Sequence, residues 1–143
     1  MKNTPTNYKD TETVKFGEHL IFDAYGCNPE KLGNMELVYK VLRDLCDMAD
    51  MKRFHEPIIV KADSHEVLGG KDPGGFSGFL MVYESHISVH TFTRRGFVTI
   101  DLYSCKKFPS EGILEYLTKT FEAKDANVLK MERGLNYPKD NIY

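Results

Sequence analysis

The chain has 143 residues, of which 41% are hydrophobic and 28% are charged, and its formal net charge is −2. This length and composition fit one soluble globular domain with a single hydrophobic core. They exclude a basic surface for nucleic acid or an anionic membrane, and no apolar run approaches the ~20 residues that a membrane helix needs.

The N-terminal residues and the cysteines bear on the cellular compartment. Residues 1–13 are polar and lack the apolar centre of a signal peptide, so we expect a flexible tail there. Cys27, Cys46 and Cys105 are odd in number and widely spaced, which fits neither a disulfide framework nor a zinc site. We therefore expect a cytoplasmic protein with reduced thiols.

The first half of the chain predicts a strand, a helix and a second strand. Apolar residues alternate with polar ones over 16–27, which indicates the first strand. Asn28-Pro29 then opens a helix that runs to about residue 50, with apolar residues every three or four positions. A short strand follows at about 57–61, and the glycine-rich segment 69–75 is predicted to be a loop.

The second half of the chain is mostly extended. Strands are predicted over residues 76–83, 87–92 and 97–103, with a turn at Arg94-Arg95-Gly96. A helix over 110–123, with Ser110 as its N-cap, and a strand over 127–133 complete the domain, residues 14–143. The pattern predicts an α+β fold, a mostly antiparallel sheet with two helices packed on one face. The other face needs a cover, so we expect a homodimer.

Two histidines and a serine lie in the central segment, and the residue pattern alone assigns them no chemistry. His86 and His90 have a spacing that suits zinc on a helix. The β-branched residues between them favour a strand, on which four residues span ~13 Å, too far for one ion. A hydrolase pair of Ser85 and His90 lacks the Gly-x-Ser-x-Gly turn and a third, orienting residue. From the pattern alone, ordinary strand residues are the favoured interpretation, and no metal site is expected.

Five collinear stretches over about residues 16–134 change that interpretation. They are Gly17-Glu18-His19-Leu20 with Tyr25-Gly26-Cys27, then Ser77-Gly78, then Glu84-Ser85-His86 with His90-Thr91, then Ile100-Asp101-Leu102 with Cys105, and finally Glu132-Arg133-Gly134. In these stretches the chain resembles the S-adenosylmethionine (AdoMet) decarboxylase family in its short bacterial and archaeal form.

The resemblance implies a proenzyme that cuts itself between Glu84 and Ser85. The products would be residues 1–84, the β chain, and residues 85–143, the α chain. Ser85 would become a pyruvoyl group, which forms a Schiff base with a substrate amine and accepts the electron pair left by departing CO₂. The family uses no metal for this step.

Three further roles follow from the resemblance. Ser77 and His90 would assist the processing, and the Cys105 thiol would return a proton to the decarboxylated carbon. An ideal strand places Ser85 and His90 on opposite faces, so we expect the backbone to bend between them.

The positions that bind AdoMet in the family differ in this chain. Gly69 and Lys71 stand where the family has a histidine and a phenylalanine, and Phe92-Thr93-Arg94 replaces Trp-Pro-Glu. Losing one base-stacking aromatic costs ~1–3 kcal/mol, and the two cations would repel the sulfonium of AdoMet. We therefore place substrate binding at Lys71, Asp72, Phe92 and Arg94. Relatives of the family act on arginine or ornithine, so the resemblance implies a basic amino acid as the expected substrate, although the two cations do not themselves explain that choice.

Two alternatives stay open. The substrate could be AdoMet itself, whose decarboxylated form serves spermidine and polyamine biosynthesis. The chain could also be a non-catalytic partner that activates a paralogue, although the presence of both Ser85 and Cys105 argues against that role.

Overall fold

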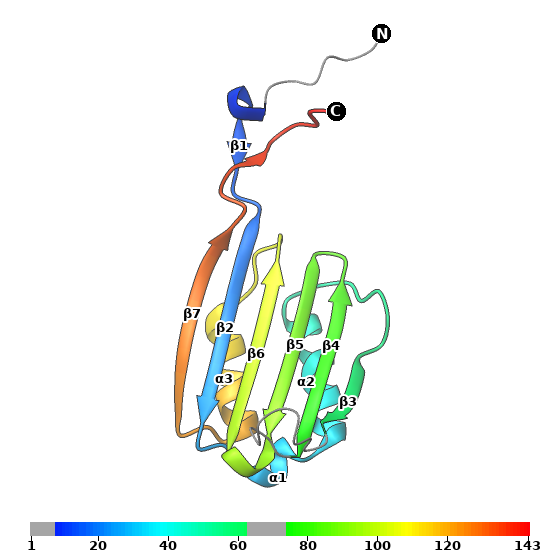
Figure 1. Cartoon of the computed structure of the whole chain (residues 1–143), viewed down its shortest axis with the longest axis vertical. Helices are drawn as coiled ribbons and strands as arrows, with labels where there is room; N and C mark the ends of the chain where they lie inside the picture. Colours follow the sequence, from blue (N-terminus) through cyan, green and yellow to red (C-terminus); the bar gives the residue numbers. More distant parts are fainter. Residues whose placement is uncertain (1–7, 63–73) are drawn as a thin grey trace.

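A computed structural model describes residues 8–62 and 74–143, which form two layers (Figure 1). A six-stranded antiparallel sheet has the strand order β3-β4-β5-β6-β2-β7. Its strands are β2 (Gly17–Tyr25), β3 (Ile58–Ala62), β4 (Gly75–Val82), β5 (Ser85–Phe92), β6 (Phe97–Ser104) and β7 (Asp125–Arg133). The helices α1 (Pro29–Leu32), α2 (Met35–Met48) and α3 (Ser110–Phe121) cover one face. The expected α+β class is confirmed.

The core lies between the sheet and the helices. Alternate residues of the strands point into it, among them Leu20, Phe22 and Leu102, and each is almost fully buried. The apolar stripes of α2 and α3 supply the other side, through Val38, Val41, Leu42, Leu45, Ile113, Leu117 and Phe121. Each fully buried side chain of this kind contributes roughly 1.5–3 kcal/mol.

Two helix boundaries differ from the sequence expectation. The single helix predicted up to residue 50 is interrupted at Gly33-Asn34, because the Asn34 side chain accepts the Leu37 N–H (3.1 Å) and starts α2 as its N-cap. Ser110 is not the N-cap of α3. It is the first helical residue after Pro109, and its hydroxyl is buried without a hydrogen-bond partner among the described residues.

Within residues 8–62 and 74–143, no helix covers the face of the sheet opposite α1 to α3, which we call the open face, and its side chains form rows across the strands. One row runs Met81, His86, Tyr103, His19 and Met131, near the end of the sheet where β5 begins. Another, further along β5, runs Ser77, His90, Thr99, Asp23 and Asn127. Large apolar side chains are exposed on this face at Ile58, Val60, Phe79, Met81, Leu129 and Met131.

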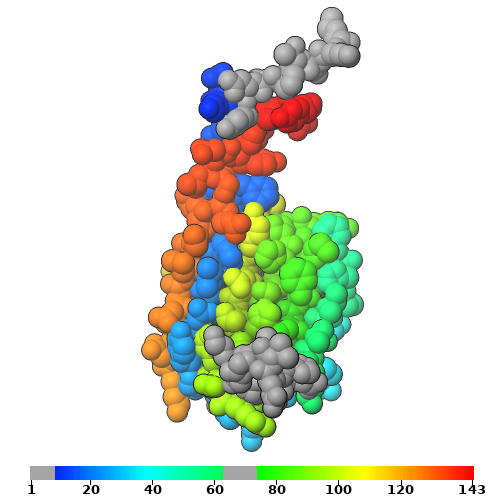
Figure 2. Space-filling model, in the orientation of Figure 1, coloured from blue at the N-terminus to red at the C-terminus, as the bar shows by residue number. Residues whose placement is uncertain are grey.

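An arm leaves the domain at the end of the sheet where β2 begins and β7 ends (Figures 1 and 2). It is built from β1 (Thr13–Val14) paired with β8 (Tyr137–Pro138). Thr13, the last residue of the expected tail, is thus held in a strand pair, while residues 1–7 lie outside the described chain. No described helix is both long and apolar enough to cross a membrane.

Candidate active site

The bond between Glu84 and Ser85 lies in a tight turn. Strand β4 ends at Val82 and β5 begins at Ser85, so only Tyr83 and Glu84 connect them. Ser85 has a φ of 152°, a conformation that side-chain-bearing residues avoid. Backbone strain of this kind costs about 1–3 kcal/mol and clusters at functional sites. The strained residue is the one that the family resemblance marks for cleavage.

The carbonyl group of that bond is already held by a donor. The Cys105 backbone N–H donates to the Glu84 carbonyl oxygen at 3.0 Å. Ser85 is paired with Ser104, the last residue of β6, which brings Cys105 next to the turn. A donor aimed at this oxygen stabilises the negative charge that develops there when a nucleophile adds to the carbonyl carbon.

The three cysteines have different surroundings. Cys27 and Cys46 are buried, and burial raises the pKa of both thiols, that of Cys27 to about 11. Cys105 is exposed beside the turn. The neighbouring Ser104 is fully buried, and its hydroxyl accepts the Lys106 N–H (2.9 Å) where the chain leaves the sheet. Cys105 is therefore the thiol placed to meet a ligand near Ser85.

Ser77 and His90 form a pair, but the structure does not bring it to Ser85. The Ser77 hydroxyl and His90 Nδ1 are 2.9 Å apart on the open face. The ladders between β5 and its neighbours continue unbroken from Ser85 to His90, so five residues separate them by ~16 Å along the strand. The expected bend is confined to Ser85 itself, and it does not shorten this separation.

Two of the predicted substrate positions, Phe92 and Arg94, are described, and both are further still from Ser85. Phe92 lines a hollow of about 460 Å³ with Tyr25, Arg95 and Phe97, in which the Tyr25 and Phe97 rings stack at 5.3 Å. Seven residues of β5 place Phe92 ~23 Å from Ser85. Arg94 is exposed in the 3-10 turn Thr93–Arg95 that follows. Lys71 and Asp72 lie outside the described residues.

The first row of the open face carries a polar network that the sequence analysis did not single out. Arg133 donates to His19 Nδ1 (3.2 Å) and lies over the Tyr103 ring at 4.5 Å. Because a guanidinium only donates, His19 carries its proton on Nε2 and gives it to Asp101 (2.8 Å). His19, Asp101 and Arg133 fall within the stretches that carry the family resemblance, but they are far apart in sequence, so spacing gave no sign of their contact.

His86 completes this row next to Ser85. Its ring stacks near Phe79 (5.7 Å) and meets the edge of Tyr103 (5.5 Å). Burial, reinforced by the nearby His19 and Arg133 and opposed by Asp101, lowers the pKa of His86 below its usual value. His86 is therefore neutral near pH 7.

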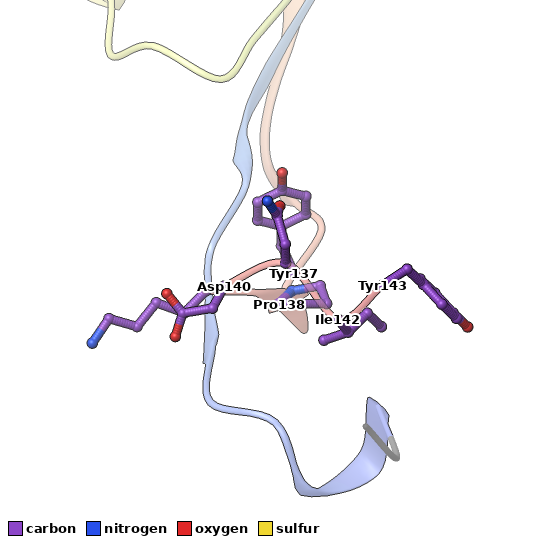
Figure 3. A pocket seen from close by; sticks show the side chains of 7 residues that line it. Tyr137, Pro138, Asp140, Ile142 and Tyr143 are labelled. Carbon is purple, nitrogen blue, oxygen red and sulfur yellow. The ribbon is translucent and has the colours of Figure 1, made fainter. Parts of the chain in front are cut away.

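The arm carries a hollow of its own, which is separate from these residues. Residues Tyr137–Tyr143 line a space of about 290 Å³ (Figure 3). None of the residues predicted to act in cleavage or catalysis lies in it.

Known proteins resemble this chain over most of its length. Residues 18–134 match the family described as S-adenosylmethionine decarboxylase. A protein from Thermococcus kodakarensis named S-adenosylmethionine decarboxylase proenzyme is 34% identical over 126 residues, which cover 87% of this chain and 81% of that protein. A Clostridium botulinum (strain Loch Maree / Type A3) protein of the same name is 36% identical over 119 residues, 82% of this chain and 94% of its own length.

The fold also has a counterpart of known structure. The crystal structure of the adenosylmethionine decarboxylase from Aquifex aeolicus superposes with a TM-score of 0.71, covering 90% of this chain and 98% of that one. At 24% identity, this likeness concerns the fold.

Proposed function

Because the chain belongs to the S-adenosylmethionine decarboxylase family, whose enzymes are pyruvoyl-dependent decarboxylases made as proenzymes, we propose that it cuts itself between Glu84 and Ser85 and decarboxylates AdoMet. One observation carries the proposal for this chain. The strained Ser85 follows a carbonyl that is already held by the Cys105 N–H. The residues present therefore fit a pyruvoyl group at position 85.

The cleavage can be written with the atoms of this chain. Ser85 Oγ attacks the Glu84 carbonyl carbon, the C–N bond breaks, and the freed nitrogen takes a proton, leaving an ester. The Cys105 N–H stabilises the oxyanion of this step. Loss of the Ser85 Cα proton then breaks the Cβ–O bond and releases Glu84 as a carboxylate. Water replaces the nitrogen at position 85 as ammonia leaves, and the ketone of the pyruvoyl group remains.

The two fragments stay together after cleavage. Strand β4 of the first fragment pairs with β5 of the second from Ser77–His90 to Val82–Ser85, so the sheet holds the new chain ends in place. A pyruvoyl group there would accept the electron pair that stays on the substrate carbon when CO₂ leaves. The exposed Cys105 thiol, beside the same turn, holds the proton that the product carbon needs.

A second copy of the chain would complete the site. Within one chain, the Ser77–His90 pair lies at the other end of β5 from Ser85. In a two-fold pair with the open faces together and the β5 strands antiparallel, the Ser85 end of one copy lies over the His90 end of the other. The exposed apolar side chains of the open face support this arrangement, because soluble monomers rarely leave such a face uncovered.

AdoMet replaces the basic amino acid as our first choice of substrate. The similar proteins of Thermococcus and Clostridium are named for AdoMet, and no comparison favours arginine or ornithine. The aromatic hollow at Phe92, Tyr25 and Phe97 offers stacking surface for an adenine from the partner copy's side. A basic amino acid remains the second candidate, because Arg94 puts a cation where the family has a glutamate. The product would serve polyamine synthesis in the cytoplasm.

Mass spectrometry and a CO₂-release assay test the proposal together. Mature protein should consist of an 84-residue fragment and a 59-residue fragment (143 − 84) that starts with a pyruvoyl group. Ser85→Ala should stay full-length, whereas the control Ser88→Ala, on the same strand, should be cleaved. An active protein with an intact Glu84–Ser85 bond would refute the cleavage proposal.

The substrate is decided by kcat/KM for AdoMet, arginine and ornithine on the same preparation. We expect the highest value for AdoMet. Arg94→Glu should raise it further, and more than Arg94→Gln, because only the glutamate adds an acceptor besides removing the charge. Higher values for arginine or ornithine in the wild type would replace AdoMet by the second candidate and leave the cleavage chemistry unchanged.

A further inference from the structure

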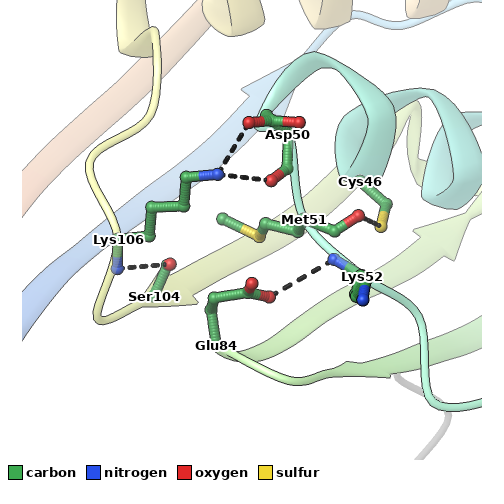
Figure 4. Close-up of polar contacts among 7 residues, drawn as sticks. All are labelled: Cys46, Asp50, Met51, Lys52, Glu84, Ser104 and Lys106. Atoms are coloured by element: carbon green, nitrogen blue, oxygen red, sulfur yellow. Dashed lines mark hydrogen bonds and ion pairs between the residues drawn. The ribbon is translucent and has the colours of Figure 1, made fainter.

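The segment Asp50–His55, which follows α2, lies along the scissile turn (Figure 4). The Tyr83 N–H donates to the Lys52 carbonyl (3.0 Å), and the Lys52 N–H donates to the Glu84 carboxylate (3.4 Å). The Phe54 N–H donates to the Met81 carbonyl (3.0 Å). This segment therefore holds the β4 side of the bond, up to Glu84 itself.

The same segment also binds the chain that follows β6, which donates to the Glu84 carbonyl. Lys106 Nζ donates to the Asp50 carbonyl (2.6 Å) and to its carboxylate (2.8 Å). Lys106 directly follows Cys105, whose N–H binds the Glu84 carbonyl. Lys52 thus binds the turn that contains Glu84, and Asp50 binds Lys106 next to Cys105. The hydrogen bond from the Cys105 N–H to the Glu84 carbonyl forms between these two segments.

The segment Asp50–His55 is anchored to the hydrophobic core through Cys46 and Met51. The Cys46 thiol, at the end of α2, donates to the Met51 carbonyl (3.2 Å), and the Met51 N–H donates to the Cys46 carbonyl (2.9 Å). Both residues are buried. The position of Asp50 and Lys52 is therefore set by the core rather than by the exposed turn.

The contact between Asp50 and Lys106 adds little to stability. The Asp50 side chain is 94% exposed and that of Lys106 42% exposed, and ion pairs in water are weak. Its geometry is nonetheless specific, because the Lys106 ammonium binds both the carbonyl and the carboxylate oxygen of Asp50. A contact that hardly stabilises the fold, yet orients the segment beside a reacting carbonyl, suits a positioning role.

We propose that Asp50 and Lys106 are positioning residues for self-cleavage, which keep the Cys105 N–H on the Glu84 carbonyl while Ser85 attacks. This inference rests on the proposed cleavage at Glu84–Ser85. It assigns the pair to the first step, attack on the amide, and not to the later release of the first fragment. A misplacement of about 1 Å at a reacting centre can cost up to ~10²-fold in rate, so a surface contact can govern this step.

The test follows freshly translated precursor by intact mass and measures its first-order rate of cleavage. Lys106→Met should slow cleavage by about tenfold, and Lys106→Arg should restore a rate near that of the wild type. Asp50→Asn, which keeps the left-handed backbone of Asp50 and the Lys106 bond to its carbonyl, should slow it less. It should add nothing in the Lys106→Met background, because the ion pair that it weakens is already absent there.

A matched control is Lys119→Met, which removes an exposed ion pair of equal length to Glu115 on α3. It should cleave at the wild-type rate, and its melting temperature should match that of Lys106→Met. The uncut Lys106→Met precursor should resist hydroxylamine, which cuts an ester but not an amide.

The outcomes separate the two proposals. Wild-type protein that never cleaves refutes the proposed function. Cleavage of Lys106→Met at the wild-type rate, failure of Lys106→Arg to restore it, or accumulation of a hydroxylamine-sensitive ester refutes the positioning role while the proposed function stands.

Discussion

The two ends of strand β5 differ in what they hold. At its first residue, Ser85, the backbone is strained and the preceding carbonyl is bound by the Cys105 N–H. At its other end, the backbone is regular, and the Ser77–His90 pair and the aromatic hollow at Phe92 face the open side. One end has the bond proposed to be cut, and the other has the histidine proposed to assist that step.

The two sets of residues that the proposed function needs therefore lie at opposite ends of one strand. A rigid antiparallel ladder keeps its two ends apart, because hydrogen bonds to both neighbouring strands fix the length of β5. The proposed function therefore requires Ser85 of one copy to meet His90 of another. Substitutions at each end of β5 test whether the two ends act together.

The first prediction tests whether His90 acts across the copies. His90→Ala alone should slow cleavage by about 10³-fold, as expected for loss of a proton-transfer group. When it is co-expressed with tagged Ser85→Ala chains, the His90→Ala chains should be cleaved again, because the tagged copy supplies an intact His90. Intact mass of the untagged chain measures this. Absence of rescue in isolated mixed dimers would place His90 in its own chain's site.

The second prediction separates the two roles of Cys105. Cys105→Ala keeps the backbone N–H that binds the Glu84 carbonyl, so the chain should still be cleaved. Without the thiol, CO₂ release per processed chain should fall by about 10²-fold. Cys27→Ala, at a buried thiol, is the control and should leave turnover per processed chain intact. Full activity of Cys105→Ala would remove the thiol from the mechanism.

The third prediction tests the effect of displacing the Cys105 N–H, which donates to the Glu84 carbonyl at the start of β5. A Cβ at Gly17 would lie 2.2 Å from the Ser104 carbonyl oxygen and 2.9 Å from Cys105 Cα. Gly17→Ala should therefore displace Cys105, slow cleavage by about tenfold and cost about 1–3 kcal/mol of unfolding free energy. The control Gly112→Ala meets no atom within 4 Å on α3, and should cleave normally and gain up to about 1 kcal/mol. Urea unfolding and the cleavage rate measure both variants.

The fourth and smallest prediction concerns pH and His86. Its pKa in the folded chain lies below the ordinary value of 6.5, so the unfolded chain binds more protons as the pH falls through that range. The stabilising effect of neutral His86 is present above pH 6.5 and is lost as the pH drops below it. Between pH about 7.5 and about 5.5, the melting temperature should fall by a few degrees more in the wild type than in His86→Phe. Equal falls would show that His86 is not the group responsible.

The local features of the fold follow from the sequence, since they depend on neighbours in the chain. Alternation over β2 and β4 to β6 indicates the strands, and the apolar stripes indicate α2 and α3. The break at Gly33-Asn34 was missed because apolar residues at helical spacing continue on both sides of it. The Ser110 N-cap was wrong because Pro109 occupies the position before the first helical turn.

The amino-acid sequence alone was enough to identify the family and to predict the bond to be cut, because Glu84-Ser85 and Cys105 stand in a recognisable order. Their positions relative to one another come from the tertiary structure. The Cys105 N–H meets the Glu84 carbonyl because the register of β5 on β6 places it there, and Asp50 reaches Lys106 because α2 packs against that sheet. Register and packing depend on the whole core at once, so residue spacing along the chain does not contain them.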